Sequence, residues 1–345
     1  MERPRVALKQ HIVIVSPALA SANNGNWQTA SRWARFLRAR YRVSIVRNWD
    51  SVDQANQIDQ DEPVLAQPDL LIALHARRSA VSLAAYARAL PGQPSVLVLT
   101  GTDLYRDIAS VPEAQASLRH ASALVLLQPA GLALVPPELR AKASVIYQSA
   151  PALQPRVRGE PRRGRDVCMI GHLRDEKDPL TFIRAAALLR DPRARMLHTG
   201  AALDPALGAA ASEAQAANPR YRWLGNLPHS DTRQRLKRCH AMVIASRMEG
   251  GANVIIEAVT SGVPVLASDI SGNRGMLGDD YQGYFAAGDA QALARLIERS
   301  LAQPGFYAHL RHQCAVRAAL FTPAAEKAAL LNLVDNLLAS RPAQT

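Results

Sequence analysis

The stretch RMEGGANVIIEAVTSGVPVLAS spans residues 247–268. A short apolar run, residues 241–245, precedes it, and the pattern predicts a buried strand, a glycine turn, a helix and a second apolar strand. Glu249 lies in the predicted turn and Glu257 in the predicted helix, with seven residues between them. Two adjacent glycines let a ligand approach the backbone, and a helix N-terminus offers free N–H groups to phosphates or sugar hydroxyls. The stretch therefore predicts a ligand site in which two carboxylates contact hydroxyl groups.

Predicted strands and helices alternate along the rest of the chain. In the first half, strands are expected at 11–16, 42–46, 70–74, 96–99, 123–127 and 144–147, and helices at 28–38, 80–90 and 112–120. In the second half, strands are expected at 167–170, 195–198, 221–224, 241–245 and 284–286. Helices are expected there at 179–190, 205–217, 230–238, 290–302, 306–320 and 323–339. Apolar strands that alternate with amphipathic helices indicate parallel sheets covered on both faces.

The alternation is interrupted once, by a segment rich in proline and glycine. A length of 345 residues also favours two domains over one. The predicted division is an N-terminal Rossmann-like domain at 1–150, a linker at 151–165, a C-terminal Rossmann-like domain at 166–320 and a final helix at 321–345 that packs back on the first domain. The fold class is α/β, with two tandem doubly wound domains whose strand ends are expected to face an interdomain cleft.

The net charge of +12 raises the question of nucleic-acid binding. The basic residues are scattered along predicted helices, and aromatic residues make up only 5% of the chain. This distribution disfavours a nucleic-acid partner and suits phosphorylated small molecules.

Three cysteines, Cys168, Cys239 and Cys314, stand far apart without metal-ligand spacing. They suggest free thiols in a reducing cytoplasm. The first apolar run, residues 11–15, is too short for a signal segment or a membrane span, so we expect a cytoplasmic protein without stable membrane association.

Several motifs together resemble the retaining GT-B glycosyltransferases of the Glu-x7-Glu type. Glu249 and Glu257 match the spacing of that motif, and residues 262–265 match the segment that follows it. Asn24-Gly25-Asn26 is similar to the family's glycine loop near the donor diphosphate, and residues 171–177 are similar to its Gly-Arg-Leu…Glu-Lys loop. The resemblance covers nearly the whole chain and implies a GT-B architecture.

The resemblance also implies roles in binding a nucleotide sugar. Glu249 would contact the sugar hydroxyls and Glu257 the ribose hydroxyls. Lys177 stands where the family has its diphosphate-binding lysine, whereas His172 occupies the usual arginine position and Arg174 is the candidate replacement. The other donor-binding candidates are Gly25, Gly250, Gly251, Ala252, Asn253 and Val254.

A narrower resemblance is to the selenosugar synthases of selenoneine biosynthesis, the SenB type. It rests on residues 24–26, 74–79, 99–107, 145–150 and 246–254. It implies transfer of a sugar from a UDP-sugar, most simply UDP-N-acetylglucosamine, onto the selenium of selenophosphate, with release of UDP and phosphate. It also implies functional coupling to an enzyme that produces selenophosphate and to a downstream enzyme that forms selenoneine.

Polar residues after two N-terminal strands give an independent indication of the acceptor. One cluster, residues 75–78, follows the strand predicted at 70–74, and the other, residues 100–106, follows the strand predicted at 96–99. Because both lie at the carboxyl ends of parallel strands, we expect them at one ligand-binding edge. Arginines and hydroxyl donors suit a small dianion, and an anionic selenium needs no general base. The acceptor-binding candidates are Asn24, Asn26, Arg77, Arg78, Thr100, Thr102, Asp103 and Arg106. The catalytic candidates are Glu249, His75 and Lys177.

No metal or other cofactor is expected. Asp59-Gln60-Asp61 resembles an Asp-x-Asp metal motif but lies in a predicted polar loop, and no His or Cys cluster has zinc spacing. Other functions stay open from sequence alone. They are a conventional glycosyltransferase with an alcohol or lipid acceptor, a nucleotide-sugar epimerase, and a non-catalytic protein that binds nucleotides or nucleic acid.

Overall fold

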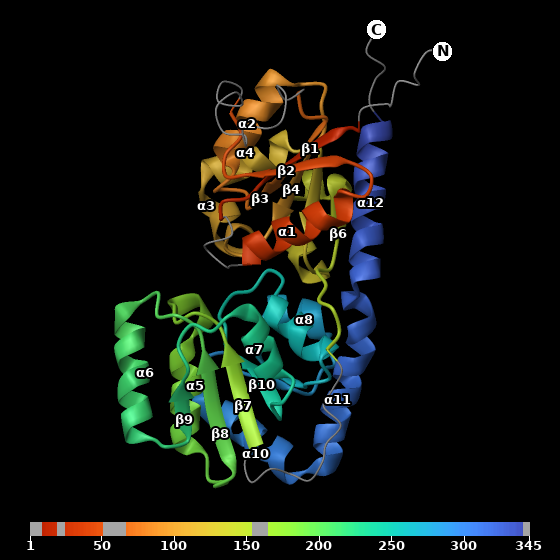
Figure 1. Ribbon diagram of the computed structural model, residues 1–345. Coiled ribbons are helices and arrows are strands. Elements are labelled where there is room, and N and C mark those ends of the chain that lie inside the picture. Colours follow the sequence, from red (N-terminus) through yellow and green to blue (C-terminus); the bar gives the residue numbers. More distant parts are fainter. Residues whose placement is uncertain (1–8, 19–24, 51–66, 154–164, 341–345) are drawn as a thin grey trace. The chain divides into compact units, whose positions relative to one another are not determined.

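The computed structural model describes residues 9–18, 25–50, 67–153 and 165–340 (Figure 1). The chain divides into two compact units. Unit 1 comprises the described part of the chain up to Tyr147 together with the segment from Ala324 onward, and unit 2 runs from Gln148 to Pro323. Asn24, the Asp59-Gln60-Asp61 segment and most of the predicted linker lie outside the described residues.

Unit 1 contains a parallel sheet of six strands. Its order is β2-β1-β3-β4-β5-β6. The strands are β1 (His11–Val15), β2 (Arg42–Val46), β3 (Leu70–Leu74), β4 (Ser95–Leu99), β5 (Ala123–Leu126) and β6 (Ala143–Val145). Every residue of β1, β3, β4 and β5 is buried, as expected for a parallel sheet with both faces covered.

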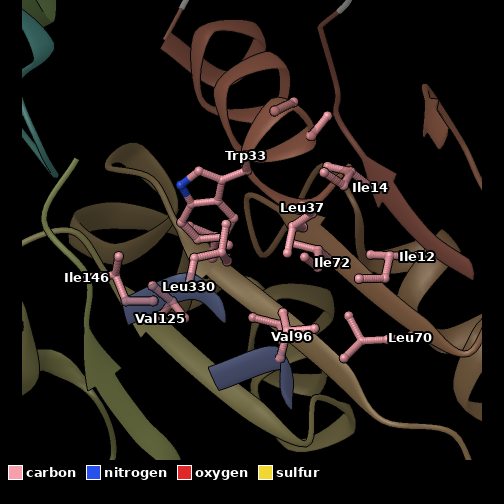
Figure 2. Close-up of a cluster of buried hydrophobic side chains, with 14 of the residues drawn as sticks. Ile12, Ile14, Trp33, Leu37, Leu70, Ile72, Val96, Val125, Ile146 and Leu330 are labelled. Carbon is pink, nitrogen blue, oxygen red and sulfur yellow. The ribbon is translucent and has the colours of Figure 1, made fainter. Parts of the chain in front are cut away.

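Helices cover both faces of this sheet. They are α1 (Gly25–Leu37), α2 (Ala80–Ala89), α3 (Ile108–Ser110), α4 (Pro112–His120) and α12 (Pro323–Ala339). Alternate residues of β1 enter different cores, since side chains of a strand point to opposite faces. Ile12 and Ile14 join Trp33 of α1 and Leu330 of α12 in one cluster (Figure 2), whereas Val13 and Val15 pack in the other cluster with α2 and α4.

The last helix is part of unit 1 although it is the final element of the chain. Glu326 of α12 is buried and accepts hydrogen bonds from Arg32 Nε at 2.8 Å and Trp33 Nε1 at 2.7 Å. Both donors belong to α1, and Figure 1 shows the two helices beside each other. A buried ion pair with an added indole hydrogen bond thus fixes α12 against α1.

Unit 2 contains a second six-stranded parallel sheet. Its order is β12-β11-β10-β7-β8-β9. The strands are β7 (Arg165–Ile170), β8 (Ala194–Thr199), β9 (Tyr221–Trp223), β10 (Ala241–Ile244), β11 (Val265–Ser268) and β12 (Tyr284–Phe285). The helices are α5 (Pro179–Leu188), α6 (Pro205–Ala217), α7 (His229–Leu236), α8 (Asn253–Thr260), α9 (Ser271–Leu277), α10 (Ala290–Ala302) and α11 (Pro304–Ala318).

The two strand orders explain where ligands can bind in each unit. In unit 2 the chain winds outward from β7 through β8 and β9, then returns to β10 on the other side of β7. In unit 1 it winds from β1 to β2 and then returns to β3. Such reversals open a crevice at the carboxyl ends of the two strands that flank the switch point. The loops after β7 and β10, and those after β1 and β3, are therefore the places to look for a site.

The fold class expected from sequence, two doubly wound α/β domains, is confirmed, and several element bounds are corrected. Gly25 is the first residue of α1, so that helix begins three residues before its predicted start. The helix predicted at 306–320 runs instead from Pro304 to Ala318. The prediction omitted α9 and the π-helical segment Asp103–Asp107. The short helix α9 carries two glycines and an asparagine, which have low helix propensity and weaken the helical signal in the sequence. Tertiary contacts therefore stabilise this helix.

Candidate functional site

Two loops meet at the switch point of unit 2. Strand β7 pairs directly with β10, with Val167 opposite Ala241, so the segments after these strands emerge at the same edge. The backbone N–H of Arg247 donates to the carbonyl of Glu176 at 2.9 Å and ties the two loops together. The Arg247 side chain also lies 3.5 Å from the buried carboxylate of Asp178. The loop positions are thus set by contacts between them.

Lys177 and Glu249 form the centre of this edge. Lys177 Nζ lies 2.5 Å from Glu249 Oε1, and both side chains are largely buried, with exposed fractions of 18% and 10%. Ser246 Oγ donates to the same carboxylate oxygen at 2.6 Å. No hydrogen bond reaches Glu249 Oε2 from any residue that the structure describes. The second carboxylate oxygen is therefore available to a ligand hydroxyl.

Lys177 lies in the turn before α5. It ends a 3-10 turn, Asp175–Lys177, and α5 begins at Pro179 after Asp178. Asp178 has a left-handed backbone, with φ of 45°. This turn directs the chain into α5 and leaves the Lys177 side chain facing Glu249. An ammonium group has three donors, so two remain for a ligand such as a diphosphate.

The glycine turn leads into α8 as expected from the sequence. Gly250 and Gly251 precede Ala252, which is the N-cap residue, and no side chain of the described chain caps the helix. The first N–H groups of a helix have no partner within the helix, so those of Asn253 and Val254 point toward the space before it. Together with the helix dipole they can bind a negatively charged or hydroxyl-bearing ligand.

Glu257 lies on α8, eight residues after Glu249, and is 8% exposed. Its Oε1 accepts a hydrogen bond from His229 Nε2 at 2.6 Å. His229 is the first residue of α7, and its side chain is 45% exposed. His229 is not among the residues predicted from sequence, because its separation from Glu257 along the chain gives no signal of the contact.

The Gly171 loop holds His172 in one protonation state. His172 Nδ1 accepts a hydrogen bond from the backbone N–H of Ala201 at 3.0 Å. Burial lowers the pKa of His172, and the neighbouring Arg174 and Lys177 lower it further, so the ring is neutral and its proton is on Nε2. His172 can therefore donate to a ligand but brings no charge. Arg174 is exposed, and its nearest carboxylate, Glu176, lies 4.0 Å away, so its guanidinium remains available.

The loops after β3 and β4 form the corresponding edge of unit 1. His75 is 2% exposed and has φ of 77°, a strained backbone for a residue with a side chain. Its Nδ1 accepts from the N–H of Arg78 at 3.3 Å, and its Nε2 lies 3.1 Å from Thr102 Oγ1. Burial is the main cause that lowers the pKa of His75. The neutral ring thus donates through Nε2 to Thr102, whose hydroxyl hydrogen is left to bind a ligand.

Asp103 orders this edge from within. Its side chain is fully buried and accepts hydrogen bonds from the backbone N–H groups of Ala76, Thr100 and Gly101 at 2.7–3.2 Å. These donors come from the loops after β3 and β4. Because the carboxylate is saturated and inaccessible, Asp103 holds the two loops together, and it does not present an oxygen to the surface as an acceptor-binding residue would.

Three arginines surround this loop pair. Arg77 Nε and Arg106 Nε contact opposite oxygens of Asp107, at 2.8 and 3.3 Å. Burial raises the pKa of Asp107, but the hydrogen bonds from Arg77 and Arg106 outweigh it and hold the pKa below its usual range. Arg78 is exposed beside His75 and has no carboxylate within ion-pair distance among the residues described. It is therefore the cation best placed to receive an anion.

The remaining predicted residues of unit 1 lie at the N-terminus of α1. Gly25 is exposed and begins the helix, and its carbonyl accepts from Thr29 Oγ1 at 2.8 Å. Asn26 is the second helical residue and is half-buried. The placement of Asn24 lies outside the described residues.

The described residues contain neither a cluster of metal ligands nor a membrane-spanning helix. Within these ranges, no group of three His, Cys, Asp or Glu side chains is arranged to hold a metal ion. A helix with the length and apolarity needed to cross a bilayer is absent from the same part of the chain.

Comparison with known proteins gives a fold for the chain and a family match for part of it. Residues 153–320 match the family described as "Glycosyl transferases group 1". Sucrose-phosphate synthase from Thermosynechococcus elongatus has a similar structure, with a TM-score of 0.75 at 19% identity over 96% of this chain and 100% of that chain. HepE from Anabaena, solved in complex with UDP and glucose, aligns with a TM-score of 0.73 at 17% identity. The alignment covers 95% of this chain and 100% of that chain.

The chain has the GT-B fold. The residues that match the group 1 glycosyltransferase family, 153–320, fall within its second unit. A glycosyltransferase from Rickettsia africae is similar too, with a TM-score of 0.73 at 15% identity over 96% of this chain and 99% of that chain. These structural comparisons confirm the GT-B fold that the sequence motifs led us to expect.

The residues that hold site residues in place were not predicted from sequence. Ser246 contacts Glu249, His229 contacts Glu257, and Asp107 binds two arginines. Ser246 offered a signal, because it lies three residues before Glu249 at the end of a buried strand. The pairing of His229 with Glu257 depends on how α7 and α8 lie beside each other and has no signal in the sequence.

Proposed function

We propose that this protein is a glycosyltransferase that uses a UDP-sugar as donor and selenophosphate as acceptor. The proposed donor is UDP-N-acetylglucosamine, and its sugar is transferred to the selenium of selenophosphate. The bond between the anomeric carbon and the UDP oxygen breaks, a carbon–selenium bond forms, and water then cleaves the selenium–phosphorus bond. The products are a 1-selenosugar, UDP and phosphate. Neither a metal nor another cofactor is invoked.

The donor half of the proposal rests on the site of unit 2. The open Oε2 of Glu249 suits a sugar hydroxyl, and the two remaining donors of Lys177, with Arg174, suit the diphosphate. Placing cations at the leaving group stabilises the charge that develops on UDP. HepE has been solved with UDP-glucose, and a pneumococcal O-GlcNAc transferase of similar fold has been solved with UDP and GlcNAc. These relatives support UDP as the nucleotide.

The acceptor half rests on one observation, which is that the candidate bases near Arg78 are already engaged. Both ring nitrogens of His75 have partners, Asp103 is saturated, and Asp107 is bound by two arginines. An alcohol acceptor requires a base to take its proton. A selenophosphate selenium is already anionic, so cations and hydroxyl donors such as Arg78 and Thr102 are sufficient. The resemblance to selenosugar synthases supports the same acceptor.

The test combines product analysis with a comparison of acceptors. Purified protein is incubated with a panel of UDP-sugars and with selenophosphate, thiophosphate, an alcohol or no acceptor, and the products are identified by mass spectrometry. We expect UDP and a carbon–selenium product only with selenophosphate. Transfer to the alcohol would indicate a conventional glycosyltransferase, and conversion of the UDP-sugar without acceptor an epimerase. Absence of any carbon–selenium product overturns the proposal.

Substitutions in unit 2 test the donor site. Glu249→Ala and Lys177→Ala should each lower kcat at least about 100-fold, because each removes a contact with the donor. Arg195→Ala is the matched control, since it removes an exposed cation of the same sheet that pairs with Asp166. It should retain wild-type turnover, and wild-type turnover in either site variant would remove that residue from the site.

A further inference from the structure

We propose that Ser246 is a positioning residue that keeps the Glu249 carboxylate aimed at the donor sugar. Ser246 is fully buried, and its hydroxyl donates to Glu249 Oε1 at 2.6 Å. Because Oε1 is held in this way, Oε2 is the oxygen that faces a ligand. The inference rests on the proposed role of Glu249 in binding the sugar of a UDP-sugar.

Two groups hold Oε1, and they differ in how firmly they are fixed. Lys177 reaches it from another loop on a flexible stem, and its ammonium is the group proposed to bind the diphosphate. Ser246 lies only three residues from Glu249, and its short side chain has one rotatable bond before the oxygen. When the two other donors of Lys177 bind the diphosphate, its ammonium can shift on the flexible stem, whereas the Ser246 hydroxyl remains on Oε1 and preserves the direction of the carboxylate.

Ser246 is itself held by a buried chain of hydrogen bonds. Ser268 Oγ donates to the Ser246 carbonyl at 2.5 Å, and Asn273 Nδ2 donates to Ser268 Oγ at 3.0 Å and to its carbonyl at 2.9 Å. All three residues are fully buried. The donor groups of this chain are all paired, which rigidifies the site, whereas Asn273 Oδ1 has no partner among the described residues. The network joins the loops after β10 and β11, so the direction of Glu249 depends on two strands of the sheet.

Gly272 fixes the backbone of the same loop. A Cβ atom at this position would lie 2.0 Å from the carbonyl oxygen of Glu249. The backbone at the start of α9 therefore packs directly on the backbone that carries Glu249. This contact limits the loop, and the Ser246 hydroxyl limits the side chain, so both parts of Glu249 are pre-organised before a ligand binds.

Ser246→Ala tests the inference, and Ser261→Ala is its control. Ser261 is a buried serine of the same unit whose hydroxyl has no hydrogen-bond partner among the described residues. We expect Ser246→Ala to lower kcat by about 10- to 100-fold, the cost of a misdirected catalytic group. Affinity for UDP alone, measured by calorimetry, should change by less than about twofold, because UDP lacks the sugar that Glu249 contacts. Ser261→Ala should match the wild type in kcat and in its affinity for UDP.

The readouts separate a positioning role from damage to the fold. Wild-type turnover in Ser246→Ala, or a parallel loss of UDP binding, overturns the inference. Gly272→Ala provides a second variant, which should lower turnover more than UDP binding. If the wild type binds UDP but transfers no sugar, the proposed function fails, and crystal structures of Ser246→Ala decide the inference separately. A Glu249 carboxylate still in its original direction would then refute it.

Discussion

At the scale of single residues, hydrogen-bond partners decide what a carboxylate can do. Glu249 and Asp103 each follow a buried strand of a parallel sheet, in unit 2 and unit 1 respectively. Glu249 receives two donors on one oxygen and keeps the other open. Asp103 receives several backbone N–H groups and is inaccessible. The first is suited to bind a ligand, and the second holds two loops in register.

Asp103→Asn should weaken acceptor binding without affecting the donor. The amide nitrogen of the new side chain would face backbone N–H groups of Ala76, Thr100 or Gly101, leaving buried donors unpaired at a cost of about 1–3 kcal/mol. We therefore expect a higher KM for selenophosphate, a less stable unit 1 and an unchanged Kd for UDP. Enzyme kinetics, urea unfolding and calorimetry measure these three quantities.

Asp279→Asn is the control for this prediction, because the Asp279 side chain is 91% exposed. It should change none of the three. An Asp103→Asn protein with wild-type stability and acceptor KM would show that the carboxylate does not order the loops.

His198 predicts how the stability of unit 2 depends on pH. Burial lowers its pKa to about 4, and its ring lies between Tyr221 OH and the Gly171 carbonyl. A histidine with a depressed folded pKa binds its proton more readily in the unfolded chain. Its contribution is therefore complete above pH of about 6.5 and is lost as pH falls toward 4, by roughly 3 kcal/mol.

Unfolding of wild type and His198→Asn by urea, from pH 7.5 to 4, measures this effect. Asparagine does not titrate, so the difference in unfolding free energy between the two proteins should shrink as the pH falls. Other titrating groups are common to both proteins and cancel. A difference that stays constant over this range would mean that His198 does not take up a proton on unfolding.

At the scale of elements, the contact between α1 and α12 shows how a helix is assigned to a domain. The apolar residues of α12 can pack on any hydrophobic face. Glu326 selects the face of α1, where Arg32 Nε and Trp33 Nε1 donate to it. Burying this carboxylate elsewhere would leave it without donors, which costs several kcal/mol. The polar contact therefore specifies where the helix docks.

Glu326→Leu should destabilise unit 1 by about 3–5 kcal/mol, since it leaves the largely buried Arg32 without its anion. Asp335→Asn on the same helix is the comparison. Asp335 pairs with Arg40 on the surface, and asparagine keeps an acceptor for Tyr41, so a loss of less than about 1 kcal/mol is expected. Thermal unfolding of the two variants measures the difference, and equal losses would contradict the proposed role of Glu326.

At the scale of the whole molecule, the two units differ in how the chain builds them. Unit 1 begins the chain and also receives its last helix, whereas unit 2 is formed by the segment between. Leu330, Leu331, Val334 and Leu338 of α12 are buried in the core of unit 1, and Figure 2 labels Leu330 among the side chains of this core. The stability of the first unit thus depends on a helix that is separated from its strands along the chain by the whole of unit 2.

Ending the chain after Thr322 should unfold unit 1 and spare unit 2. The truncated protein loses the buried leucines of α12, each worth about 1.5–3 kcal/mol. Hydrogen exchange should show lost protection in β1, β3 and β4 but retained protection in β7 and β10, together with retained UDP binding. Ending the chain after Ser340 keeps α12 and serves as the control. Retained protection in unit 1 of the shorter protein would contradict the prediction.

The sequence by itself determined the fold class and the turn and helix that carry Glu249 and Glu257. Runs such as Leu70–Leu74 and Ala241–Ile244 are apolar throughout, as is typical of strands in a parallel sheet that is covered on both faces. The two glycines before α8 predict a turn. These signals are local, so the chain displays them without a structure. The same is true of the spacing between Glu249 and Glu257.

Only the tertiary structure decided which partners these residues have. Lys177 and Ser246 share Glu249 Oε1, His229 binds Glu257, and Asp103 faces inward. Each of these contacts except that of Ser246 joins loops or helices that follow different strands. Their meeting depends on strand order and register, which follow from packing of the whole sheet. A residue type indicates which chemistry a side chain can perform, and the packing decides which of its atoms are left free to perform it.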